Sequence, residues 1–157
     1  IIYYQKYSFV NNIRMLESQV FYPNSMLHHY LHMATKNYRE YLKGPQVRIK
    51  KYFYVLRPIL ACKWIEKYQV TPPISFNELV KEIIPEGELK LAISNLLERK
   101  LKGDELDLEP RIDVINEYVE VEMDHLQHYI KTLKVDTKDP TEELDKLFRS
   151  TLQEVWK

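Results

Sequence analysis

The stretch KKYFYVLRPILACKWIEK, residues 50–67, decides the fold. At about 100° per residue, its apolar side chains spread around most of a helix circumference. A helix that is apolar on all sides is a buried one, so we expect this segment to be the central helix of the core. Arg57 interrupts the apolar run, with no acid nearby in the sequence. A buried arginine must pair with an acid or face an anion, which makes Arg57 the first functional hint.

Apolar residues at helical spacing continue on both sides of this stretch. They predict helices at 9–20 and 24–42 before it, and at 75–84, 88–102, 110–133 and from 139 onward after it. Gly44-Pro45 is a strong stop for the second helix, and Ser75 with Glu78 forms a capping box. No hairpin signal is found. The sequence therefore predicts an all-α protein, a bundle of about six helices.

Length and composition indicate one globular domain of 157 residues, 45% of them apolar. We expect residues 1–134 to form the helical domain and residues 135–157 to add a C-terminal helix packed on it. The chain begins with Ile1 in the middle of a pattern, so we expect it to be a fragment of a longer protein.

Charge and cysteine content narrow the function. Lys+Arg and Asp+Glu number 23 each, so any basic site must be local. With Cys62 as its one cysteine, the chain can form neither an internal disulfide nor a thiolate metal cluster, which fits a reducing, cytoplasmic location. Only 3 glycines are present, which nearly excludes phosphate-binding glycine loops. No run approaches about 20 apolar residues, so we expect no membrane span.

A basic stripe runs along the expected helix at 24–42. Its members lie within roughly 80° of one another: His28, His32, Lys36, Arg39 and Lys43. The short Gly-Pro connection suggests that this helix and the central one are neighbours. Cations on facing helices repel unless an anion such as phosphate, or acidic side chains, lies between them. A solvated helix face remains the plainer alternative.

Tyr54 is the best candidate for stacking on a base, since Lys50, Tyr54 and Arg57 share one side of the central helix. Most aromatic residues at helical spacing belong to the core instead. The candidate contacts to a nucleotide or phosphate are His32, Lys36, Arg39, Lys50, Lys51, Tyr54 and Arg57.

Two other patterns are weaker. His28 and His32 have the spacing of two metal ligands on one helix, but zinc needs a third ligand, and two surface histidines are the preferred interpretation. Asp107 and Glu109 have the spacing of a two-metal site, yet they lie between helices without a preceding Gly-Ser turn. We interpret them as acids near a helix start. The sequence predicts no catalytic and no metal-binding residue in this chain.

Three phrases carry a family resemblance: MLHHYLHMATKNYREYL at 26–42, KKYFYVLRPILACKWIEKY at 50–68 and LDLEPRIDVINEYVE at 106–120. They resemble the helical C-terminal part of the predicted nucleotidyltransferases of the DNA polymerase β superfamily, in the branch named for an RNA repair pathway. The likeness covers about residues 1–133 and is weaker over residues 135–157.

The resemblance implies more than the chain contains. In that family an N-terminal α/β palm carries a Gly-Ser turn and metal-binding carboxylates, and uses two divalent ions to transfer a nucleotidyl group from a nucleoside triphosphate. Those motifs are missing here, so we expect this chain alone to be inert and to hold no cofactor. Mg and a nucleoside triphosphate are implied for the full-length parent, with the palm as a partner in cis and RNA as a further candidate partner.

Two hypotheses follow. In the first, the chain is an accessory helical domain that walls the active-site cleft and contacts nucleotide or RNA phosphates. In the second, it is a stand-alone helical protein-interaction module without a phosphate ligand. The second predicts that Arg57 pairs with an internal acid such as Glu109, Asp113 or Glu117.

Overall fold

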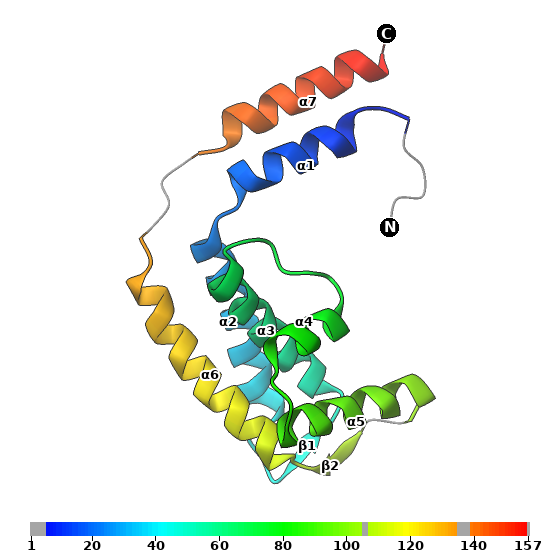
Figure 1. The fold of residues 1–157 in the computed structure, drawn as a ribbon, viewed down its shortest axis with the longest axis vertical. Helices are drawn as coiled ribbons and strands as arrows, with labels where there is room; N and C mark the ends of the chain where they lie inside the picture. The colour runs from blue at the N-terminus through cyan, green and yellow to red at the C-terminus, as the bar shows by residue number, and fades with distance from the viewer. Residues whose placement is uncertain (1–5, 105–106, 135–138, 157) are drawn as a thin grey trace. The chain divides into compact units, whose positions relative to one another are not determined.

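The computed structural model describes residues 6–104, 107–134 and 139–156, apart from the side chains of residues 18 and 19. Within these ranges the all-α class is confirmed, with seven helices and one two-stranded ribbon (Figure 1). In chain order the elements are α1 (Phe9–Val20), α2 (Pro23–Tyr41), β1 (Gln46–Arg48), α3 (Lys51–Tyr68), α4 (Phe76–Ile83), α5 (Glu88–Lys102), β2 (Leu108–Pro110), α6 (Asp113–Thr132) and α7 (Thr141–Val155).

The chain forms two compact units, one containing α1 and α7 and the other containing α2 to α6 with both strands. In the first unit α1 packs against α7. The Ser8 hydroxyl donates a hydrogen bond of 2.6 Å to the Glu154 carboxylate, which joins the two helices at one end. Leu147 on α7 is buried. We expected residues 1–134 to form one domain, whereas the structure groups α1 with the C-terminal helix.

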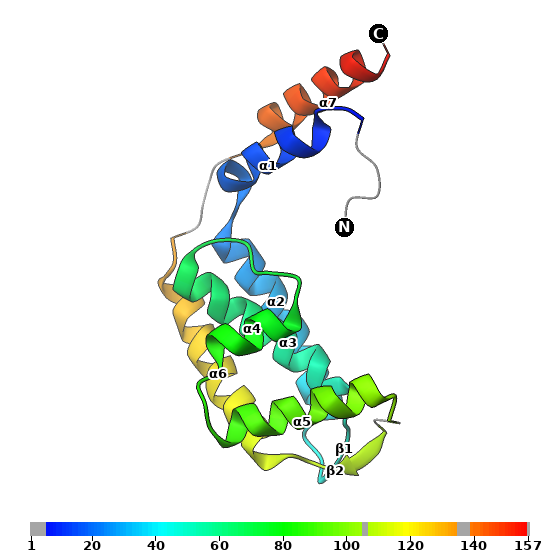
Figure 2. The ribbon, with the colours of Figure 1, turned by 45° about the vertical axis from the view of Figure 1, so that its right-hand side comes forward.

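Helix α3 is the core of the larger unit. Helices α2 and α6 pack against it and against each other, and α4 also packs against α3 (Figure 2). The buried residues of α3 point to every side of the helix, as the sequence predicts: Tyr52, Val55, Leu56, Pro58, Ile59, Leu60, Ala61, Cys62 and Ile65.

The predicted helix ends of α4 and α5 are confirmed. The backbone N–H of Glu78 donates to the Ser75 hydroxyl at 3.3 Å, as in an N-cap. Gly103 ends α5 in a left-handed conformation with φ of 79°, and the Asp104 N–H donates to the Arg99 carbonyl at 3.1 Å. Glycine has no Cβ to oppose this conformation, so its place at the end of α5 has a direct structural reason.

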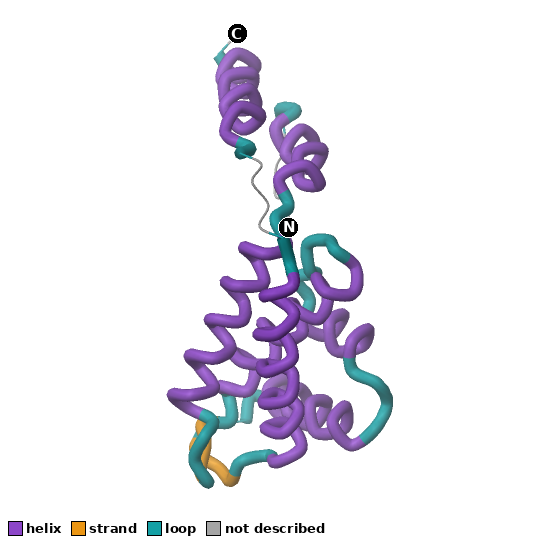
Figure 3. The backbone as a smooth tube through the Cα atoms, turned by 90° about the vertical axis from the view of Figure 1, so that its left-hand side faces the viewer, coloured by secondary structure: helices purple, strands orange, loops and turns teal. Residues whose placement is uncertain are grey.

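The ribbon was not predicted. Strands β1 and β2 pair antiparallel, with Val47 opposite Glu109, and they lie at one end of the larger unit (Figure 3). Val47 is buried while its two neighbours are exposed. Because residues 108–110 are extended, α6 begins at Asp113 rather than at residue 110. Among the described helices, none is long and apolar enough to cross a membrane.

Candidate functional site

Lys51, the first residue of α3, lies between two aromatic rings. Its Nζ is 3.8 Å from the ring centroid of Tyr41 and 4.8 Å from that of Tyr54. Both distances are within the range of a cation–π interaction. Tyr41 is the last residue of α2, so this contact joins the end of α2 to the start of α3.

Lys50 and Tyr54 line a hollow of about 300 Å³. The start of α3 also contributes Phe53, and the end of α5 contributes Lys100 and Asp104. The Nζ of Lys100 lies 4.6 Å from the ring centroid of Phe53. The structure thus brings together Lys50, Tyr54 and, next to them, Lys51, three of the residues proposed from the sequence.

This group of residues carries excess positive charge. Among the residues that the structure describes, Lys50, Lys51 and Lys100 form no ion pair. The nearest acid of the hollow, Asp104, is itself 3.7 Å from the Arg99 Nε. The start of a helix adds a partial positive charge of its own. The site therefore favours an anion.

Arg57 is half-buried, and its Nη1 is fully buried without a hydrogen-bond partner in the described part of the chain. Glu109, a partner suggested by the interaction-module hypothesis, pairs instead with Arg99 through two hydrogen bonds, one of 3.0 Å. Asp113 pairs with Arg111 at 2.6 Å, and no ion pair of Glu117 is found within the described ranges. Within the described residues, the ion pair of Arg57 that the interaction-module hypothesis predicts is not formed.

The cations of α2 face elsewhere. His32, Lys36 and Arg39 are all exposed on this helix. By helical geometry they point roughly 140–180° away from Tyr41, the residue that contacts Lys51. The structure therefore does not bring them to the start of α3. They lie on a second, separate basic face of α2, and phosphate binding there stays a prediction.

The structure also shows where the two weaker patterns lie, the histidine pair on α2 and the acid pair Asp107 and Glu109. His28 is exposed on α2, and among the described residues no group of three or more His, Cys, Asp or Glu could hold a metal ion. Asp107 accepts a hydrogen bond of 2.9 Å from the Ile49 N–H through its backbone carbonyl. The Glu109 carboxylate is held by Arg99, so it joins β2 to α5 instead of lying at a helix start.

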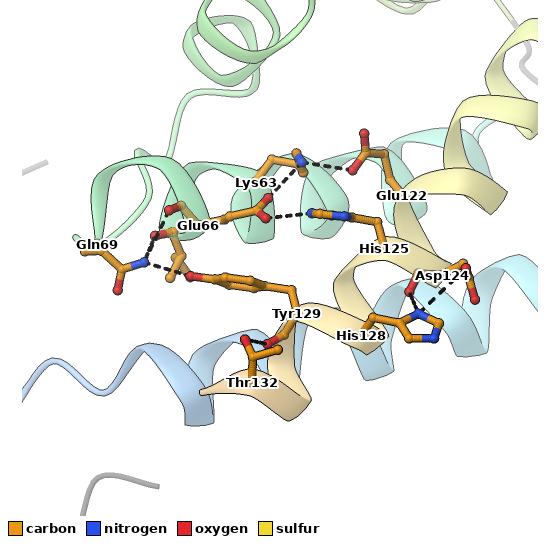
Figure 4. Close-up of polar contacts among 10 residues, drawn as sticks. Lys63, Glu66, Gln69, Glu122, Asp124, His125, His128, Tyr129 and Thr132 are labelled. Carbon is orange, nitrogen blue, oxygen red and sulfur yellow. Dashed lines mark hydrogen bonds and ion pairs between the residues drawn. The ribbon is translucent and has the colours of Figure 1, made fainter. Parts of the chain in front are cut away.

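A charged network between α3 and α6 was missed from the sequence (Figure 4). The Nζ of Lys63 lies 2.7 Å from a carboxylate oxygen of Glu66 and 3.1 Å from one of Glu122. The His125 Nε2 lies 2.6 Å from the other oxygen of Glu66. Burial alone would raise the pKa of Glu66, but hydrogen bonds from Lys63 and His125 lower it below its usual value.

Lys63 faces two carboxylates in this network, so the network lacks the excess positive charge found at the start of α3. Its location between two packed helices fits a structural role. The sequence does contain a signal: Lys63 with Glu66, and Glu122 with His125, are each spaced by three residues, so each pair lies on one helix side. That signal shows which side of each helix is polar but not that the two sides meet.

Comparison with known proteins places the chain among relatives. A family profile described as RNA repair pathway DNA polymerase beta family (RlaP) matches residues 1–150. The chain is 48% identical over 157 residues to the Bacillus subtilis (strain 168) protein that carries the name Uncharacterized protein YcgL. This alignment covers 100% of the chain but only 60% of that relative's length. No solved structure matches the chain.

Proposed function

Since the chain belongs to the RNA repair pathway DNA polymerase beta family, we propose that it is an accessory helical domain of a nucleotidyltransferase. In this role it walls the active-site cleft and contacts nucleotide or RNA phosphates. The residues proposed for these contacts are Lys50, Lys51, Tyr54 and Arg57 on and before α3, and, as a separate surface, His32, Lys36 and Arg39 on α2.

One observation carries the proposal: among the described residues, Lys50 and Lys51 at the start of α3, and Arg57 further along it, form no ion pair. Lys51 is held between two rings, and Arg57 keeps a buried N–H without a partner. Keeping the N–H of Arg57 buried and without a partner costs free energy in the absence of a ligand. A phosphate group would provide acceptor oxygens for this N–H and a negative charge for Lys51.

The chemistry of nucleotidyl transfer needs divalent ions, and the described residues do not fit a site for them. We therefore assign no metal ligand to this chain and no step that involves the metal. The proposal places the ions, with the nucleoside triphosphate they bind, in a palm domain of the longer parent protein. The contribution of this chain is to bind and orient phosphate by charge.

A nucleotide titration of the longer protein tests the proposal. Lys51→Met retains most of the alkyl chain between the rings but removes the charge. We expect it to weaken binding of nucleoside triphosphate or RNA several-fold and to lower the slope of log affinity against log salt by about one. Lys131→Met, an exposed lysine of α6 without an ion pair in the described chain, is the matched control. Equal affinities for both variants and the wild type would exclude phosphate contact at Lys51.

A second candidate is the protein-interaction module. It is favoured by exposed apolar side chains in the unit formed by α1 and α7, where Phe148 is 62% exposed and Met15 is 64% exposed. If these side chains form one contiguous patch, that patch would be typical of a binding site for another protein. The titration separates the candidates, because an interaction module should bind neither nucleotide nor RNA.

A further inference from the structure

The lining of the hollow at the start of α3 contains more than phosphate binding requires. In this hollow, defined by Lys50, Phe53, Tyr54, Lys100 and Asp104, two aromatic rings and a carboxylate accompany the cations. A site for phosphate alone would gain nothing from the rings and would lose affinity through the acid. The chemistry of these additional groups therefore indicates what the ligand carries besides phosphate.

The aromatic part of the hollow is fixed on one side and open on the other. Phe53 contacts Lys100 and packs edge-on against Phe76, with 5.6 Å between the ring centroids. Tyr54 is 56% exposed although Lys51 lies over its ring. An exposed ring held by a cation is a suitable platform for stacking by a nucleobase, which has a π-face whatever its identity.

Asp104 is positioned by the turn that ends α5. Its N–H donates to the Arg99 carbonyl at 3.1 Å, directly after the left-handed Gly103. Its Oδ2 lies 3.7 Å from the Arg99 Nε, which leaves Oδ1 without a hydrogen-bond partner among the described residues. An ionised carboxylate only accepts hydrogen bonds, so it suits hydroxyl donors and repels phosphate oxygens. The hydroxyls of a ribose are such donors, and the 2′-hydroxyl is what distinguishes a ribonucleotide from a deoxyribonucleotide.

We propose that this hollow binds one ribonucleotide, with its base stacked on Tyr54, its phosphate at Lys50 and Lys100, and a ribose hydroxyl donating to Asp104. The volume of about 300 Å³ is at the small end of ligand sites and suits a single nucleotide rather than a duplex. This inference rests on the proposed function and extends it, because it adds Lys100 and Asp104 and specifies the sugar. The ribonucleotide is either a free nucleoside triphosphate or one residue of a single RNA strand.

Binding measurements on the 157-residue chain test the site in two arms. The first arm uses a fluorescently labelled single-stranded RNA of about ten nucleotides and the DNA of the same sequence; this length spans the site size of single-strand binding folds. The second arm compares ATP with dATP by calorimetry. Both are measured for the wild type, Lys100→Ala, Tyr54→Ala, Asp104→Ala and the control Lys131→Ala, after circular dichroism has shown that each variant is folded.

The expected result is specific to each variant. Tyr54→Ala should weaken ribonucleotide binding roughly tenfold through lost stacking, and Lys100→Ala should weaken it in a salt-dependent way. Asp104→Ala should remove a preference for ribose of about tenfold, the ratio expected for a hydrogen bond to a charged group. It should leave binding of the deoxy ligand unchanged or tighter. The arm in which these effects occur identifies the source of the ribonucleotide.

Two results would overturn the inference, and they differ in what they leave standing. In the first, all three hollow variants bind the ribonucleotide with an affinity within twofold of that of the control. The ligand would then lie elsewhere on the chain, and the proposed function would stand. Absence of binding in both arms would remove this site, and the titration of the longer protein with Lys51→Met would then decide the phosphate role of the chain separately. If Asp104→Ala still bound the ribose ligand more tightly than the deoxy ligand, Asp104 would not be the acceptor of the ribose hydroxyl.

Discussion

The side-chain Nδ2 of Asn116 on α6 donates a hydrogen bond of 2.8 Å to the backbone carbonyl of Leu42, directly after α2. The Oδ1 of Asn116 accepts a hydrogen bond of 2.6 Å from the Tyr52 hydroxyl on α3, so one side chain connects three helices. Asn116 is only 3% exposed. We expect Asn116→Ala to lower the free energy of unfolding by about 2–4 kcal/mol, because the buried Leu42 carbonyl and Tyr52 hydroxyl would each lose a hydrogen bond. Urea denaturation followed by circular dichroism measures this change.

The matched control is Asn95→Ala on α5, where the asparagine is exposed and makes no hydrogen bond within the described ranges. That change should stay within about 0.5 kcal/mol of the wild type. If the two variants were equally stable, Asn116 would not be the connection between the helices that its geometry indicates.

The helices could be predicted from the sequence because their signals are local. The all-round apolar pattern of residues 50–67 identified α3, and Ser75 and Gly103 marked the start of α4 and the end of α5. The ribbon could not be predicted, since its strands of three residues lie about sixty residues apart in the chain and have no periodicity of their own. The Asn116 network is equally non-local.

The candidate site was predictable in part, for the same reason. Lys50 and Tyr54 share one side of a helix, and the sequence alone places them together. Lys100 and Asp104 come from the end of α5, so only tertiary packing brings them to the hollow. We expected the basic stripe on α2 to share a hollow with the start of α3, since a short connection makes two helices neighbours. A short connection does not determine which sides of the two helices face each other, so this part of the prediction could not be made from the sequence. Tyr41, not Lys36, lies on the side that meets Lys51.

Cys62 should be unreactive in the folded protein. Its side chain is fully buried in α3, and burial raises the pKa of the thiol to about 12. The thiolate is the reactive form, so both access and ionisation oppose modification. We expect a chromogenic disulfide reagent to label no thiol in the native protein at neutral pH and one thiol per chain in denaturant. Rapid labelling of the native protein would contradict the burial of α3.

Glu66 should contribute a pH-dependent part of the stability. Lys63 and His125 hold its pKa below the usual value against the effect of burial. A carboxyl group with a lowered pKa in the folded state stabilises the protein above its unfolded pKa, near 4.3, and this contribution is lost as the pH falls through the folded pKa. We expect Glu66→Gln to be less stable than the wild type by about 1 kcal/mol at pH 7.

The lowered pKa of Glu66 also determines how the stability difference between Glu66→Gln and the wild type changes in acid. Its difference from the wild type should shrink below a pH of about 4 and vanish once the wild-type carboxyl is protonated. Urea midpoints measured from neutral to acidic pH follow this change. The control is Glu117→Gln on α6, since Glu117 is exposed and has no ion pair in the described chain. A constant difference between Glu66→Gln and the wild type at all pH values would show that the ion pairs contribute nothing.

Substitution of Arg57 distinguishes a ligand-binding role of this residue from a structural one. Arg57→Met retains most of the side-chain volume and removes a buried N–H that has no partner among the described residues. If this group is kept for an anion, its removal relieves a desolvation cost, and the free energy of unfolding should stay unchanged or rise by about 1 kcal/mol. Pyrophosphate should then raise the melting temperature of the wild type but not that of Arg57→Met, because only an anion-binding folded state gains from the ligand.

Arg48→Met, which removes an exposed arginine of β1 without an ion pair in the described chain, should retain the response to pyrophosphate. Thermal unfolding of the three proteins, with and without pyrophosphate, is sufficient for the comparison. A loss of several kcal/mol in Arg57→Met would instead assign Arg57 to the packing of α3. An equal pyrophosphate effect on all three proteins would mean that the anion binds away from Arg57, because the buried N–H would then take no part in binding.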